Sequence, residues 1–287
     1  MSAVVAPARS LPELGPAPLN RSRKRWTRFI LPTYTIIMIV YLASPIFVMI
    51  LYGFNDVPFD RQTAKFWGFT LDWWKNVFNV PGLYPAFKNS LKIAPIAAAI
   101  STTIGTLFGL ALGRYRFRGL KPVDFIIFLA IAVPEIVLGA SLLSMFVLAG
   151  VPTGFTTIIL SHIGFSIAFV AVTVRARVQG LDRNLEDAAQ DLFASPASAF
   201  FKVTLPLIAP AILAGFLLAF VLSLDDFVIT NFVAGPMTTF PLWVYGAQRI
   251  GVPPQVNVMG TLLFGAGIFA AVASVLGQHR RSRALRP

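Results

Sequence analysis

Three carboxylates lie inside long apolar stretches of this sequence, where an ionisable side chain is costly. Glu135 follows a proline in the stretch 123–148, and Asp225 and Asp226 are adjacent near the end of the stretch 207–229. Acidic groups at such positions line a path for cations, or they accept hydrogen bonds and ion pairs where a helix is broken. The sequence therefore predicts a cation pathway at these three residues, with a structural role, such as pairing with Arg249, as the alternative.

The spacing of these acids places them at different depths. Glu135 lies about 12 residues into its stretch, or roughly 18 Å along a helix, and the aspartates lie roughly 28 Å beyond Pro206. Neighbouring helical residues point about 100° apart, so Asp225 and Asp226 cannot both face one lumen equally.

The sequence contains no pattern typical of catalysis or of metal binding. It has no glycine-rich nucleotide loop followed by lysine, no paired-histidine zinc motif and no cysteine. The two histidines, His162 and His279, lie far apart, and His162 is predicted to be a hydrogen-bonded packing residue. We therefore expect no catalytic residue, no metal ligand and no cofactor in this chain.

The segment 175–206 predicts two short helices outside the membrane. Leu181, Leu185, Ala188 and Leu192 recur at the spacing of one helix face, which leaves an apolar stripe. Asp182 or Asn184 can cap this helix, Glu186 and Asp187 then suit its first turn, and a second helix can begin at Ser195-Pro196. The stripe must be buried either by a partner or by the chain's own spans.

The composition predicts that these segments belong to an all-α, multi-pass membrane protein. Of the 287 residues, 56% are hydrophobic and only 13% are charged, whereas soluble domains carry about 25% charged residues. A span needs about 20 apolar residues. About six stretches qualify: 29–54, 91–112, 123–148, 157–174, 207–229 and 256–276.

Lysines and arginines predict the orientation of these spans. Basic residues gather before the first stretch, between the second and third, between the fourth and fifth, and after the last. These segments share one face if there are six spans, so both termini are predicted to be cytoplasmic. We expect a disordered basic tail at 1–28, a permease domain at 29–277 with the loop 175–206, and a basic tail at 278–287. This distribution explains the formal charge of +12 without nucleic acid.

One long outer segment, 55–90, is rich in aromatic residues such as Trp67, Phe69, Trp73 and Trp74. Tryptophan favours the boundary between membrane and water. The segment is predicted to lie along the outer surface, with a contact surface for an external protein as the alternative.

The loop 175–206 resembles the cytoplasmic signature of binding-protein-dependent ABC importer permeases. That signature reads E-A-A, three residues, G, nine residues, I-x-L-P, and the spacing here matches it throughout. The resemblance implies a type I importer permease fold and a coupling helix that docks on an ATPase subunit. The residues to which it assigns ATPase coupling are Glu186, Asp187, Ala188, Ala189, Leu192, Phe193, Ala194, Val203, Leu205 and Pro206.

Three positions depart from the signature, namely Asp187, Val203 and Phe193, and the last is the largest change. Glycine there supplies a left-handed turn, which costs a residue with a Cβ about 1–2 kcal/mol. We therefore hypothesise that Phe193 keeps a negative φ and that its ring packs toward the partner.

Further motifs resemble the spermidine/putrescine branch of this family, in particular its second permease. They include Phe69–Trp74, Val133–Val137, Ser223–Val228 and Gly235–Leu242. The resemblance implies ATP-driven polyamine import across the bacterial inner membrane, with a second permease, an ATPase dimer that binds ATP and Mg, and an external binding protein as partners. The alternatives are another cationic or small organic solute for the same machinery, and a self-contained secondary transporter.

Overall fold

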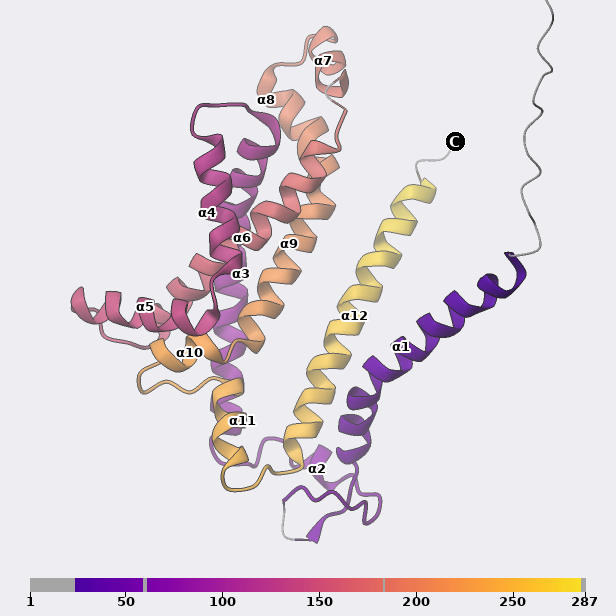
Figure 1. Cartoon of the computed structure of the whole chain (residues 1–287), viewed down its shortest axis with the longest axis vertical. Helices are drawn as coiled ribbons and strands as arrows, with labels where there is room; N and C mark the ends of the chain where they lie inside the picture. The colour runs from indigo at the N-terminus through magenta and orange to yellow at the C-terminus, as the bar shows by residue number, and fades with distance from the viewer. Residues whose placement is uncertain (1–23, 59–60, 183, 285–287) are drawn as a thin grey trace, which may run out of the picture. The chain divides into compact units, whose positions relative to one another are not determined.

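The computed structural model describes residues 24–58, 61–182 and 184–284, and these residues are mainly helical (Figure 1). Their only extended pairing is a single bridge between Asn55 and Phe69, which confirms the all-α prediction. The helices are α1 (Lys24–Tyr52), α2 (Asp72–Lys75), α3 (Leu83–Arg114), α4 (Leu120–Ala132), α5 (Glu135–Leu148), α6 (Phe155–Gln179), α7 (Asn184–Asp191), α8 (Pro196–Ala199), the π-helical turn η3 (Phe200–Thr204), α9 (Leu205–Asp225), α10 (Val228–Val233), α11 (Phe240–Gln248) and α12 (Gln255–Ala284).

Several of these helices are long and apolar enough to cross a bilayer. Four described segments qualify alone, namely Phe29–Tyr52, Leu83–Arg114, Phe155–Gln179 and Pro196–Asp225, and the pair α4–α5 qualifies as one bent span. The sixth predicted stretch falls on α12, whose apolar part Gln255–Phe269 is shorter. The multi-pass prediction is confirmed, and the cytoplasmic position of the termini stays a prediction.

The helices α1 and α12 extend into the segments that were predicted to be tails. Helix α1 begins at Lys24, inside the predicted tail 1–28, and residues 1–23 lie outside the described part of the chain. Helix α12 continues to Ala284, so most of the predicted tail 278–287 is helical. The chain divides into two units after Leu51, so α1 forms a unit of its own.

The third predicted span, 123–148, consists of two helices joined by a sharp bend at Pro134. Helix α4 ends at Ala132, α5 begins at Glu135, and the two axes differ by 105°. Val133 and Pro134 have extended backbone angles, with ψ of 129° and 131°. The reason is local, because a proline has no N–H to donate and pushes the residue before it out of the helical region.

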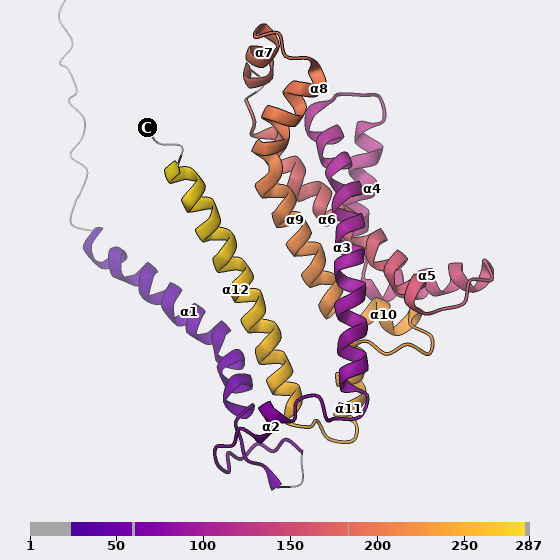
Figure 2. The ribbon, with the colours of Figure 1, turned by 180° about the vertical axis from the view of Figure 1, so that it is seen from behind.

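Helices α3, α6 and α9 lie side by side in both views of the second unit (Figures 1 and 2). Gly105 and Gly109 of α3 allow the close approach to α6. A methyl group on Gly105 would lie 2.6 Å from Cβ of Val170, and one on Gly109 would lie 2.9 Å from Cβ of Val174. Small residues of this kind let membrane helices pack backbone to backbone.

A buried apolar cluster joins α5 and α10 to α3 and α6. Ile93 of α3, Phe146 of α5, Ile158 of α6 and Ile229 of α10 are buried in it. Gly139 of α5 lies against α10, since a Cβ there would lie 2.6 Å from a ring carbon of Phe232. The two short helices α5 and α10 are therefore packed on each other.

The aromatic outer segment folds around the buried side chain of Asn55. The side-chain amide of Asn55 donates to the backbone oxygen of Lys65 (2.9 Å) and accepts the N–H of Trp67 (2.7 Å). The backbone oxygen of Asn55 accepts a hydrogen bond from Trp73 Nε1 (2.8 Å). The rings of Trp67 and Phe69 remain exposed. These rings are available either to the membrane boundary or to a partner, and both readings of the segment stay predictions.

Candidate functional site

The helical hairpin between α6 and α9 is built by the capping residues that the sequence predicts. Asp182 Oδ1 accepts the N–H of Asn184 (3.0 Å) ahead of α7, and Glu186 and Asp187 lie in its first turn. Ser195 Oγ accepts the N–H of Ser198 (3.2 Å) at the start of α8. Carboxylates in the first turn favour this helix because they complement its dipole.

Glu186 ties the hairpin to the spans on either side of it. Its carboxylate accepts hydrogen bonds from the Arg114 guanidinium at the end of α3 and from the Thr204 hydroxyl just before α9. The Glu186 side chain is only 16% exposed, so it faces the helices of its own chain. Sequence spacing did not reveal Arg114 or Thr204 as its partners, because they lie 72 and 18 residues away.

The predicted apolar stripe is buried at one end only. Leu181 packs on the cluster of α3, α6 and α9, whereas Leu185 is 46% exposed and Leu192 is 81% exposed. The chain's own spans therefore cover the base of the stripe and leave its tip open.

The hypothesis for Phe193 is wrong. Its φ is +64° and its side chain is 99% exposed, so it adopts the left-handed turn with its ring in solvent. The reason lies in two backbone hydrogen bonds that close α7, from Phe193 N–H to the Gln190 oxygen (2.9 Å) and from Ala194 N–H to the Ala189 oxygen (3.1 Å). This pattern satisfies the last carbonyls of a helix and requires a left-handed residue at this position.

The remaining members of the predicted coupling set are distributed over the hairpin and the start of α9. Asp187 and Ala188 are exposed on α7, and Pro206 is exposed on α9. Ala189 and Ala194 are half-buried in the hairpin. Val203 lines a small cavity with Glu186 and Leu181, and Leu205 packs on the same apolar cluster as Leu181.

The second group of predicted residues lies at the two helix breaks. Glu135 is the first residue of α5 and Asp225 is the last residue of α9, and both are exposed. Helix α5, which begins with Glu135, packs on α10, which begins three residues after Asp225. The structure therefore places the two helix breaks on neighbouring segments.

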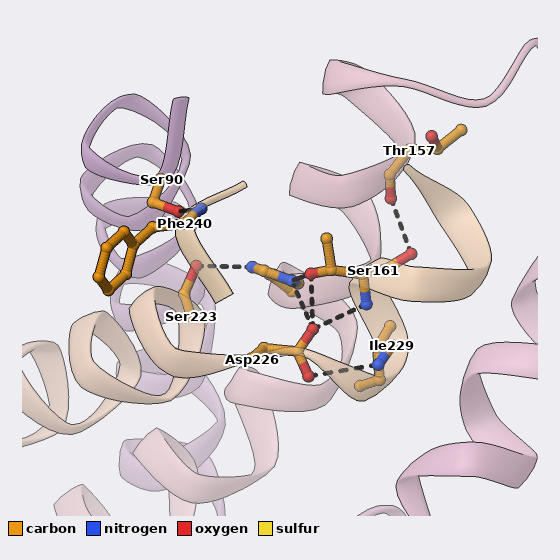
Figure 3. A network of polar contacts seen from close by, with 9 residues as sticks. Ser90, Thr157, Ser161, Ser223, Asp226, Ile229 and Phe240 are labelled. Carbon is orange, nitrogen blue, oxygen red and sulfur yellow. Dashed lines mark hydrogen bonds and ion pairs between the residues drawn. The ribbon is translucent and has the colours of Figure 1, made fainter. Parts of the chain in front are cut away.

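Asp226 occupies a different environment from its neighbour. It is 9% exposed, and it accepts the backbone N–H groups of Ile229 (3.4 Å) and Thr230 (2.8 Å) at the start of α10 (Figure 3). The structural alternative predicted for one aspartate thus holds for Asp226. Arg249 is not its partner in the described part of the chain, because the guanidinium lies over the Tyr245 ring at 5.4 Å.

His162 of α6 completes this buried network. Its Nδ1 lies 2.6 Å from Ser223 Oγ of α9, and its Nε2 lies 3.2 Å from Asp226 Oδ2 and 3.0 Å from Thr230 Oγ1. The imidazole is 1% exposed, which confirms the prediction of a hydrogen-bonded packing residue. No group of metal-binding side chains occurs among the described residues.

Comparison with known proteins identifies the family. Residues 105–279 match the model of the binding-protein-dependent transport system inner membrane component. The chain belongs to this family. It is an inner-membrane permease component, and the family resemblance inferred from the sequence is confirmed.

Curated relatives lie within the predicted branch. The chain is 40% identical to the spermidine/putrescine transport system permease protein PotC of Escherichia coli K12 over 82% of this chain and 89% of that protein. It is 38% identical to the putrescine transport system permease protein PotI of the same strain, over 86% of this chain and 90% of PotI. A solved bacterial ABC transporter that imports alginate has the same fold, with a TM-score of 0.63, 16% identity and coverage of 92% of this chain and 99% of that one.

Proposed function

We propose that this chain is a permease subunit of an ATP-driven polyamine importer, with spermidine and putrescine as cargo. The observation that carries the proposal is the 40% identity to PotC over 89% of that protein. Identity of this size over nearly the whole relative supports a shared cargo class. Its partners are a second permease, a dimer of ATPase subunits that binds ATP and Mg, and an external binding protein.

The hairpin supplies the contact with the ATPase in this proposal. Leu192 is 81% exposed at its tip, and an apolar stripe on a short exposed helix needs a partner to cover it. Asp187, Ala188 and Phe193 are exposed beside it. Glu186, held by Arg114 and Thr204, passes the motion of the hairpin to α3 and α9.

Glu135 and Asp225 supply the cation pathway in this proposal. Two exposed carboxylates at neighbouring helix breaks attract a cation, and their mutual repulsion is relieved when an ammonium group lies between them. Asp226 contributes indirectly, because its carboxylate is already occupied by the first turn of α10.

Transport by the assembled complex tests the proposal. Vesicles with the permeases, the ATPase and the binding protein should take up labelled spermidine or putrescine only when ATP is supplied. We expect Glu135→Gln and Asp225→Asn each to lower uptake by about tenfold, since each removes a charge contact worth roughly 1–3 kcal/mol. Asp72→Asn is the matched control, because Asp72 is an exposed acid on the outer segment.

Three results would contradict parts of the proposal. Uptake without ATP would favour a secondary transporter. ATP-driven uptake of another solute, with polyamines inert, would keep the machinery and change the cargo. Full polyamine uptake by both carboxylate variants would remove Glu135 and Asp225 from the pathway.

A further inference from the structure

We infer that His162 is a positioning residue for the cation pathway: it holds the Asp226 carboxylate inside the protein and thereby fixes the helix break at which Asp225 is presented beside Glu135. This inference rests on the proposed function, because the pathway carboxylates are part of that proposal. The imidazole lies on α6, whereas its three side-chain partners lie on α9, on α10 and in the break between them.

The hydrogen-bond roles in the network follow from the chemistry of its members. An ionised carboxylate only accepts, so His162 Nε2 carries the hydrogen that faces Asp226 Oδ2. In a neutral imidazole Nδ1 is then an acceptor, and the Ser223 hydroxyl donates to it over 2.6 Å. The Thr230 hydroxyl accepts from Nε2 and donates to Asp226 Oδ2 over 2.6 Å. One tautomer therefore satisfies every buried polar group in the network.

The network fixes the break because it grips the chain on both sides of it. Ser223 lies in the last turn of α9, and Thr230 lies in α10. The Asp226 backbone between them has φ of −61° and ψ of 121°, which ends the helix. The bonds from its carboxylate to the ring and to the α10 backbone hold Asp226 in this non-helical conformation.

The position of Asp225 is a consequence of this break. Asp225 is the last helical residue of α9 and its side chain is exposed, whereas Asp226, one residue later, is buried. The α10 helix that follows packs on α5, the helix that begins with Glu135. If α9 ran on as a regular helix, α10 would follow the α9 axis and could no longer pack on α5 as it does here. The position of Asp225 relative to Glu135 would then change.

Cysteine chemistry can read out this spacing without any transport assay. The chain contains no cysteine, so Asp225→Cys and the pair Glu135→Cys/Asp225→Cys introduce its only thiols, and modification is followed on this chain, separated from the other subunits after labelling of the full complex in membrane vesicles. The measurements are the rate of modification of residue 225 by a charged thiol reagent and the yield of the 135–225 cross-link. Both are compared with and without changes at His162.

His162→Phe should change the modification rate by about tenfold and lower the cross-link yield, because it removes all three hydrogen bonds. His162→Gln should stay within about twofold of the parent, since its amide N–H can still reach Asp226. Ser223→Ala, which frees only the Nδ1 side of the ring, should shift the rate in the same direction by about threefold. Ser161→Ala is the matched control, because Ser161 Oγ donates only to Thr157 within α6 (2.7 Å) (Figure 3).

A modification rate and a cross-link yield that stay at parental values in His162→Phe would overturn the inference. If His162→Phe does not assemble with the ATPase, Ser223→Ala decides, and an unchanged rate there overturns it equally. If the complex with the unaltered chain does not take up polyamines, only the proposed function is refuted. The inference about His162 is still tested, because thiol modification requires no cargo.

Discussion

At the scale of single residues, the neighbours Glu186 and Asp187 face opposite surroundings. Glu186 is bonded to Arg114 and Thr204 and faces the bundle, whereas Asp187 is exposed on the outer side of α7. Both belong to the predicted coupling set, and their roles in this account differ. Glu186 is the proposed anchor of the hairpin, and Asp187 is proposed to face the ATPase.

Glu186→Gln and Arg114→Gln should each loosen α7 by roughly 1–3 kcal/mol, because each removes the charge-assisted hydrogen bonds between these two half-buried side chains. The measurement is hydrogen exchange of the α7 amides, which should become about tenfold faster or more. The double variant should cost less than the sum of the single ones, since the two residues act on one contact. Asp187→Asn is the control. Additive effects in the double variant, or unchanged slow exchange in the single variants, would contradict the role of Glu186 as an anchor.

Single residues also mark the limit of sequence reasoning here. Spacing correctly predicts the cap at Ser195 and limits the residues that can cap α7 to Asp182 or Asn184, because capping is decided within four residues. It wrongly predicts the backbone of Phe193, because the hydrogen bonds of the helix end outweigh a left-handed cost of about 1–2 kcal/mol. It does not predict which of Asp225 and Asp226 is buried, since only the fold brings His162 next to Asp226.

At the scale of elements, the packing of α3 against α6 depends on glycine. A Cβ on Gly105 would lie 2.6 Å from Cβ of Val170, whereas a Cβ on Gly164 of α6 meets nothing within 4 Å. Gly105→Ala should therefore destabilise the protein by roughly 1–3 kcal/mol through overpacking. Gly164→Ala should be neutral or stabilising by up to about 1 kcal/mol, because alanine favours a helix.

The measurement for these two variants is the unfolding midpoint of the purified chain in mild detergent. A lower midpoint for Gly105→Ala and an unchanged or higher one for Gly164→Ala is the expected result. Equal midpoints would mean that α3 and α6 do not approach as closely as this account requires.

The elements show which level of structure apolar length can predict. It correctly locates the helices on all six predicted stretches, since burial in lipid requires continuous apolar helices. It does not predict the 105° turn between α4 and α5, although Pro134 marks the position. Helix α4 has 13 residues and reaches only about 20 Å. The direction of α5 after the bend depends on its packing against α10, which no local sequence pattern reveals.

At the scale of the whole molecule, the two candidate sites lie at opposite ends of α9. The hairpin precedes the first residue of α9, and Asp225 is the last of its 21 residues, roughly 30 Å away along the axis. In the proposed function, contact with an ATPase at the hairpin therefore acts on the carboxylates at the other end through α9. Such an arrangement fits a permease that is driven mechanically by a separate subunit.

A cysteine at the tip of the hairpin tests this central claim most directly. In the otherwise cysteine-free chain, Leu192→Cys should cross-link to the ATPase subunit of the assembled complex, and the outer-segment variant Trp67→Cys should not. The cross-link yield should change when ATP binds, because closure of the ATPase moves the hairpin. A Leu192→Cys thiol that reacts freely with water-soluble reagents in the complex and never cross-links to the ATPase would contradict the account.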